Sequence, residues 1–228
     1  MSINVKNTIR FTLPGLAAPH YCCSCGRIGA LLCEYCKYDI ISDIPVQCLA
    51  CLRPVARYGD VCSQCKIAYS KGWFVSLHQG AVRKLIGYHK FKRGRAANTV
   101  LADLLHQALP LLPPKLTITA VPTVHSHIRS RGYDHAALLA KGLASHRNIP
   151  YKAALKRARN TTQRGAGRAA RIKQAEQAFK CNKRLSGPYL LIDDVCTTGA
   201  TVHFAAKALL AAGASQVWVA VISREPLN

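Results

Sequence analysis

The chain has 228 residues, 50% of them hydrophobic, and 32 basic against 10 acidic side chains give it a net charge of +22. The hydrophobic content excludes an intrinsically disordered chain. The longest apolar runs fall short of the roughly 20 residues that a membrane-spanning helix needs, so we expect no membrane insertion and a cytoplasmic protein. Residues 152–184 hold eleven basic side chains against one acidic, which favours a polyanionic partner such as nucleic acid. A solvated basic face that only aids solubility is the alternative.

Eight cysteines between residues 22 and 65 form four Cys-x-x-Cys pairs. Each such turn directs two thiolates at one ion, and two turns complete a tetrahedral four-cysteine zinc site of the structural kind. We therefore expect two structural zinc ions. Short loops favour pairing in sequence order, a cross-braced pairing stays open, and disulfides are the disfavoured alternative because no secretion signal is recognisable. The predicted ligands are Cys22, Cys25, Cys33 and Cys36 for one ion and Cys48, Cys51, Cys62 and Cys65 for the other, with Cys23 as a spare buried thiol.

Hydrophobic periodicity divides the chain into two predicted domains. Residues 1–72 have too few large apolar side chains for a core of their own, so zinc must stabilise this part. Residues 73–228 alternate between strand-like and helix-like patterns, which predicts an α/β domain with a parallel sheet flanked by helices. The expected strands are 73–78, 116–121, 150–155, 189–192 and 216–223, and the expected helices are 81–109, 135–146, a segment ending near 179, and 201–212.

The most informative segment is 189–201, where an apolar strand runs into Asp193 and Asp194 and a hydroxyl-rich turn then opens a helix. Backbone N–H groups of such a turn, together with the helix dipole, form a phosphate site. Adjacent carboxylates suit a vicinal diol and can also steady a magnesium ion. The alternative is that the acids only cap the following helix. The predicted loop consists of Cys196, Thr197, Thr198, Gly199, Ala200 and Thr201.

The run from Asp193 to Thr201 resembles the phosphoribosyl pyrophosphate (PRPP) motif of type I phosphoribosyltransferases. With the four cysteine pairs, the whole chain resembles the ComF family, cytoplasmic proteins of natural competence and DNA utilisation. Residues 121–122, 131–135 and 159–179 add to the likeness, although Asp134 and His135 stand where the family has Asn and Gln. The resemblance implies a type I phosphoribosyltransferase-like sheet preceded by a double zinc ribbon.

The resemblance also implies roles for individual residues. Asp193 and Asp194 would bind the ribose hydroxyls of PRPP, the loop at 196–201 would bind its 5′-phosphate, and magnesium would accompany the ligand. Arg129 and Arg131 would bind pyrophosphate, and Arg171 would act from a closing loop with Arg159, Arg164 and Arg168. If the site is catalytic, its residues would be Asp193, Asp194, Arg131 and Arg171.

Two hypotheses about function follow from these features. In the first, the protein is an enzyme that transfers the phosphoribosyl group of PRPP to an unidentified base or other nucleophile. In the second, it is a binding module that holds PRPP or a nucleotide while a basic face carries single-stranded DNA. The resemblance adds a competence helicase as a partner, with the zinc knuckles as its docking surface.

Overall fold

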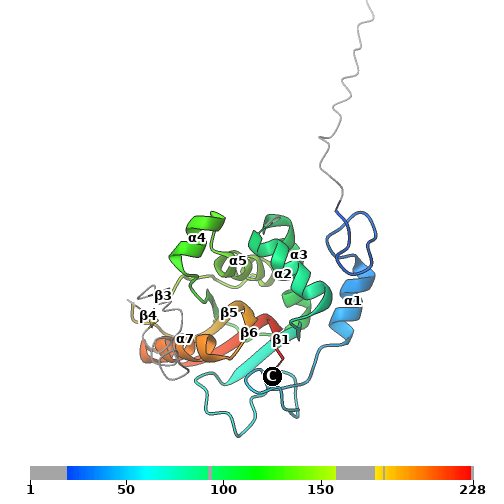
Figure 1. Cartoon of the computed structure of the whole chain (residues 1–228). Helices are drawn as coiled ribbons and strands as arrows, with labels where there is room; N and C mark the ends of the chain where they lie inside the picture. Colours follow the sequence, from blue (N-terminus) through cyan, green and yellow to red (C-terminus); the bar gives the residue numbers. More distant parts are fainter. Residues whose placement is uncertain (1–19, 92–93, 158–177, 182, 227–228) are drawn as a thin grey trace, which may run out of the picture.

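The computed structural model describes residues 20–91, 94–157, 178–181 and 183–226 (Figure 1). Its core is a parallel sheet with helices on both faces, and a cysteine-rich segment precedes the first strand. The elements in chain order are α1 (Glu34–Ser42), β1 (Lys71–Leu77), α2 (Gly80–Phe91), α3 (Gly94–Ala108), β2 (Thr117–Ala120), α4 (His125–Arg131), α5 (His135–Arg147), β3 (Lys156–Arg157), β4 (Phe179–Lys180), β5 (Pro188–Cys196), α7 (Ala200–Ala211) and β6 (Gln216–Arg224).

The main sheet has the strand order β1-β6-β5-β2, and every neighbouring pair is parallel. Side chains of β5 alternate between two cores because successive residues of a strand point to opposite faces. Leu190 and Ile192 pack with α2, α3 and α5, whereas Tyr189 and Leu191 pack with α7. Both faces of the sheet are thus covered (Figure 1), which explains why its central strands are almost uniformly apolar. The predicted parallel sheet flanked by helices is confirmed.

Most of the expected elements lie where the periodicity placed them. The segments 73–78, 116–121 and 216–223 correspond to β1, β2 and β6, and 135–146 and 201–212 correspond to α5 and α7. The single helical region expected over 81–109 is two helices, α2 and α3. Gly94 begins α3 where a Cβ atom would lie only 2.2 Å from the Tyr133 hydroxyl oxygen, so only glycine allows this close approach.

The prediction of a strand at 150–155 is wrong. Tyr151 forms a single parallel bridge with Ile118 on the outer edge of β2, so the position was right but the pairing stops after one residue. Further along the chain, the backbone amide of Ala154 donates to the Lys152 carbonyl (2.9 Å) and to the Thr119 hydroxyl (3.3 Å), and not to a backbone carbonyl of β2. This local turn ends the strand.

The acid pair lies inside a strand, whereas the sequence placed it after one. β5 continues to Cys196 because β6 pairs with it over its whole length, with Asp193 opposite Val221 and Cys196 opposite Arg224. The segment 158–177, with Arg159, Arg164, Arg168 and Arg171, lies outside the described residues. The helix expected to end near 179 falls mostly there, and Phe179 itself begins β4, which pairs antiparallel with β3.

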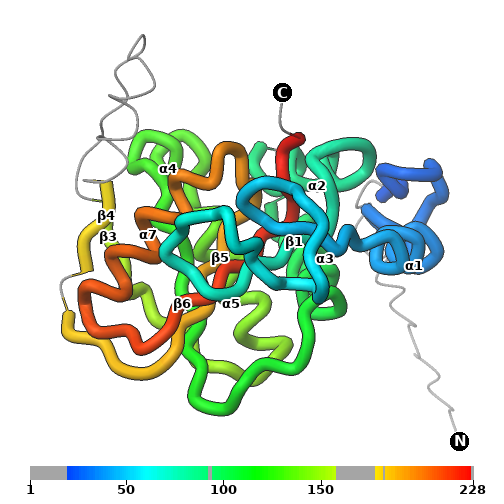
Figure 2. Tube along the Cα trace, turned by 90° about the horizontal axis from the view of Figure 1, so that it is seen from below, coloured from blue at the N-terminus to red at the C-terminus, as the bar shows by residue number. Residues whose placement is uncertain are grey.

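The cysteine-rich segment packs against the sheet and helices in two places. Cys22 and Leu31 share the core that contains Leu101 of α3, whereas Leu49 and Tyr69 share the core on the α7 side. Figure 2 shows α1 and the first part of this segment at one side of the molecule and the second part across the sheet region. A boundary at 72/73 stays a prediction, and β1 begins at Lys71. Among the described residues, no helix is both long and apolar enough to span a bilayer.

Candidate functional site

The centre of the site is the carboxylate of Asp194 at the carboxyl end of β5, where its side chain is almost fully buried. Its Oδ2 lies 2.8 Å from Nζ of Lys90, in the last turn of α2, and 3.4 Å from Nε2 of His135, the first residue of α5. Burial opposes ionisation, but the neighbouring His135 and the charge of Lys90 outweigh it and hold the pKa of Asp194 well below its usual range. Asp194 is therefore a charged acceptor at neutral pH.

Asp193 differs from its neighbour in environment. Its Oδ1 accepts a hydrogen bond from the Asp194 amide at 2.9 Å, and its side chain is partly exposed. The low polarity of its surroundings and the adjacent Asp194 charge raise the pKa of Asp193. The pair thus resists carrying two full negative charges, and a ligand hydroxyl or cation at Asp193 would relieve that repulsion.

The tautomer of His135 follows from its neighbours. Nη1 of Arg131 lies 3.2 Å from Nδ1 of His135, and a guanidinium can only donate. Nδ1 therefore accepts, and a neutral imidazole carries its hydrogen on Nε2, toward Asp194. Asp134 supports this arrangement, because it caps α5 and accepts a hydrogen bond from the Thr123 hydroxyl at 2.8 Å. Asp134 and His135, two of the residues at which the chain differs from the family pattern, are both structural members of the site, whereas a third, Gln174, lies outside the described residues.

The loop after β5 has the geometry of an anion site. Gly199 has a φ of +79°, which glycine adopts without strain, and it precedes α7, whose N-terminus has no side-chain cap. The side chains of Thr197 and Thr198 are exposed, and the Thr198 hydroxyl accepts from the Ala200 amide at 3.4 Å. A helix start without an N-cap side chain, two exposed hydroxyl groups and a nearby carboxylate pair fit a sugar phosphate.

Cys196 is the buried end of the loop. Burial raises the pKa of its thiol to about 11, although the neighbouring Arg224 acts in the opposite direction. The thiol is therefore protonated at neutral pH and unsuited to nucleophilic chemistry.

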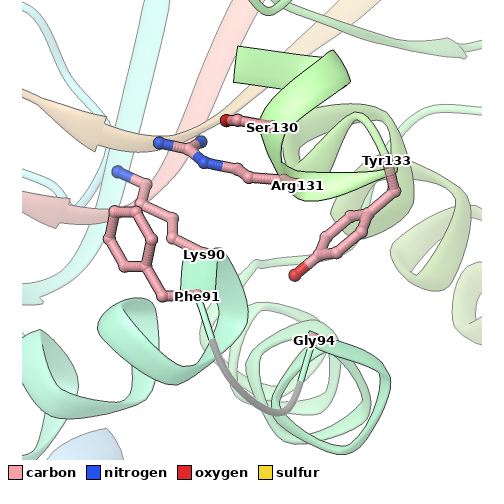
Figure 3. A pocket seen from close by; sticks show the side chains of 6 residues that line it. All are labelled: Lys90, Phe91, Gly94, Ser130, Arg131 and Tyr133. Atoms are coloured by element: carbon pink, nitrogen blue, oxygen red, sulfur yellow. The ribbon is translucent and has the colours of Figure 1, made fainter.

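A pocket of about 440 Å³ lies beside the acid pair, between the ends of α2 and α4. The Arg131 guanidinium stacks on the Phe91 ring, 4.9 Å from its centroid. Figure 3 shows the Lys90 and Arg131 nitrogens together on one side of the pocket, and the Tyr133 hydroxyl points toward its interior. No carboxylate is among the described residues that line it, so its charge suits an anion. The lining residues are Lys90, Phe91, Gly94, Ser130, Arg131 and Tyr133.

Arg131 is linked to the acid pair through His135, which contacts both Arg131 and Asp194. Arg129 has no such link in the part of the chain that the structure describes. Arg129 is exposed on α4, and among the described residues no contact joins it to Asp193 or Asp194. Arg171 lies outside the described part of the chain. Lys90 was not predicted as a site residue, because it lies within the single helix expected over 81–109 and no local pattern pairs it with Asp194.

The eight predicted zinc ligands form two groups in sequence order, so the favoured pairing is confirmed. Within each group the sulfur atoms lie within 4.8 Å of one another, with Sγ–Sγ distances of 3.7 Å for Cys25 and Cys33 and 3.4 Å for Cys51 and Cys62. Zn–S bonds of about 2.3 Å in a tetrahedron place sulfurs about 3.8 Å apart, so both groups fit a zinc ion. Cys23 is not a member, because its buried thiol donates to the Ala81 carbonyl at 3.6 Å.

Two curated proteins are similar to most of the chain. Competence protein F of Haemophilus influenzae is 29% identical over 209 residues, which cover 85% of this chain and 90% of the relative. The chain is a homologue of this competence protein. DNA utilization protein YhgH of Salmonella typhi is 27% identical over 215 residues, which cover 82% of this chain and 95% of the relative. No family model matches the chain.

Two solved structures are similar to part of this ComF homologue. One is described as the allosteric regulatory enzyme of purine biosynthesis, with 20% identity and a TM-score of 0.43. The other is glutamine PRPP amidotransferase from B. subtilis, with 19% identity and a TM-score of 0.43. Each match covers 60% of this chain, which spans 30% of the length of either structure.

Proposed function

We propose that this ComF homologue acts in DNA uptake or utilisation and binds PRPP at the carboxyl end of β5. The observation that carries the proposal is the ionised Asp194 beside Asp193, followed by a loop that opens α7 without a side-chain cap from its N-cap residue, Gly199. Asp193 and Asp194 would accept hydrogen bonds from the ribose hydroxyls, and the amides of the loop at 197–201 would hold the 5′-phosphate. Magnesium bound with PRPP would neutralise its pyrophosphate.

Isothermal titration with PRPP and magnesium tests this assignment. Hydrogen bonds to charged groups contribute about 1.5–3 kcal/mol each, and Asp194 is the ionised acid of the pair, so Asp194→Asn should weaken PRPP binding roughly 10-fold to 100-fold. Asp39→Asn, a change at an exposed acid of α1, is the matched control and should leave binding unchanged. If the wild-type protein does not bind PRPP, or if both variants bind it equally, the assignment is wrong.

We also propose that single-stranded DNA binds the basic face predicted around residues 152–184. The support is the charge of the segment, most of which lies outside the described residues. If about six phosphates are contacted, log K should fall with log salt at a slope of about −4. Fluorescence anisotropy of a labelled oligonucleotide measures the slope, and a salt-independent signal would exclude the site.

Phosphoribosyl transfer is the second candidate function, favoured by the anion-suited pocket beside Asp194. Lys90 and Arg131 would stabilise the departing pyrophosphate. Release of pyrophosphate from PRPP in the presence of pooled nucleobases tests it, with Asp193→Asn as the background. Equal release by both proteins would leave a binding function alone.

A protein partner would dock on the first cysteine knuckle. Tyr21, Tyr35 and Tyr38 are 55%, 70% and 72% exposed there, and tyrosine is enriched at protein interfaces. We propose a competence helicase as this partner and the cytoplasm as the place of action. Purified helicase should bind the wild-type protein and lose affinity for a Tyr35→Ala, Tyr38→Ala double variant, and equal binding would contradict the surface.

A further inference from the structure

The side chain of Arg224, the last residue of β6, is fully buried. No carboxylate lies within ion-pair distance of it among the described residues, although an unpaired buried charge is costly. Five backbone carbonyls take the place of a counterion. They belong to Leu49 (Nε, 2.8 Å), Ala50 (Nη2, 3.1 Å), Cys196 (Nη1, 3.2 Å), Glu225 (Nη1, 2.6 Å) and Thr197 (Nη1).

Four of these carbonyls belong to two regions with different tasks, and the fifth is that of Glu225, the next residue in the chain. Leu49 and Ala50 are the two residues between the zinc ligands Cys48 and Cys51, so their conformation depends on the second metal site. Cys196 and Thr197 begin the loop assigned to the 5′-phosphate. One guanidinium therefore bonds the second cysteine cluster and the phosphate loop at the same time.

The contact also determines which way the loop amides point. All described peptide bonds are trans, and in a trans peptide the C=O and the N–H of the next residue point in opposite directions. The Cys196 carbonyl also accepts from the Glu225 amide at 2.9 Å. Because the carbonyls of Cys196 and Thr197 face Arg224, the amides of Thr197 and Thr198 face away from it, toward the exposed side of the loop.

We propose that Arg224 is a positioning residue that couples the second zinc site to the phosphate loop. A metal held by Cys48, Cys51, Cys62 and Cys65 fixes the Leu49–Ala50 turn, the turn holds the guanidinium, and the guanidinium holds the two loop carbonyls so that their amides converge on an anion. The identity of the anion rests on the proposed PRPP function, but the coupling itself does not.

The first cysteine cluster is the internal control, because its contacts lead elsewhere. Lys37, on α1, pairs with Asp103 of α3 at 2.7 Å, and the Cys23 carbonyl accepts from Lys84 of α2 at 3.1 Å. Among the described residues, no hydrogen bond joins this cluster to the loop at 196–201. Loss of the first metal should therefore leave the loop unchanged.

Backbone ¹⁵N relaxation of Thr197 and Thr198 tests the coupling without PRPP. In the zinc-loaded wild type their order parameters should be near the rigid value of about 0.85, and in Arg224→Met and Cys51→Ser they should fall below about 0.6. Arg224→Lys keeps the charge but cannot serve carbonyls in three directions, so it should be intermediate. Cys25→Ser, which removes a ligand of the first cluster, should match the wild type.

A second measurement separates the coupling from the proposed ligand. PRPP affinity should fall at least tenfold in Arg224→Met and Cys51→Ser and less than twofold in Cys25→Ser. If the wild type fails to bind PRPP while the order parameters respond as stated, the coupling holds and the ligand assignment fails. Unchanged loop order in both Arg224 variants, or equal effects of Cys25→Ser and Cys51→Ser on the loop, would overturn the coupling.

Discussion

The two cysteine clusters have the same ligands and similar sulfur geometry, yet they attach to different parts of the molecule. The first packs with the helices on one face of the sheet and joins α3 through the Lys37–Asp103 ion pair. The second packs with the core on the opposite face and reaches the phosphate loop through Arg224. Two clusters with the same set of ligands therefore contact different faces of the sheet, and only the second is joined by hydrogen bonds through Arg224 to the loop after β5 among the described residues.

The largest expected effect is on zinc content and thermal stability when one cysteine ligand is removed from either cluster. Structural zinc contributes about 10–16 kcal/mol of apparent binding free energy in small peptides, so Cys25→Ser and Cys51→Ser should each lower zinc content from two ions to one and destabilise the adjacent segment. Zinc content by mass spectrometry and thermal unfolding measure this. A single variant that releases both ions would show that the clusters are not independent.

Alkylation of the two buried non-ligand thiols sharpens the comparison. The pKa of Cys196 is about 11 because of burial, against about 8.5 for a free thiol, so at pH 8 its thiolate fraction and its alkylation rate should be roughly 200-fold lower than in the unfolded chain. The stability from this neutral thiol is complete below about pH 8.5 and is lost as pH rises through 11. Labelling with iodoacetamide, read by mass spectrometry, should therefore rise between pH 9 and 11.

The same labelling distinguishes the two regions at a single pH. At pH 8, Cys51→Ser should expose Cys196 to the reagent but leave Cys23 protected by its burial against α2. Cys25→Ser should do the reverse. Equal exposure of both thiols in either variant would mean that the molecule opens as one unit.

The smallest expected effects concern one ion pair in each region. Lys37 and Asp103 are only 11% and 25% exposed, whereas Lys71 and Asp60 are 41% and 27% exposed. Lys37→Met should lower the free energy of unfolding by about 1 kcal/mol and Lys71→Met by at most about 0.5 kcal/mol, because water screens the more exposed pair. Double-mutant cycles with Asp103→Asn and Asp60→Asn, measured by denaturant unfolding, isolate each pair. A larger coupling for the Lys71 pair would contradict this ranking.

Local patterns were sufficient for the parts of the protein that depend on near neighbours in sequence. The spacing of the Cys-x-x-Cys turns predicted both four-cysteine groups, because each turn holds its two thiols only three residues apart. The apolar run before Asp193 predicted β5, and the glycine and small residues after it predicted the turn into α7. The end of β5 was misjudged because strand length depends on the partner strand: β6 pairs with β5 as far as Cys196, and the local pattern around Asp193 does not encode that pairing.

The partners of the buried charges depend on the fold as a whole. The sequence alone showed that two acids precede a glycine-containing, hydroxyl-rich loop, since that motif is continuous in the chain. Lys90 as the partner of Asp194, the tautomer of His135 and the bond between Arg224 and Leu49, 175 positions apart, came from the folded chain. The physical reason is that a buried charge takes whichever donor or acceptor the packing brings near it, and no local periodicity encodes that choice.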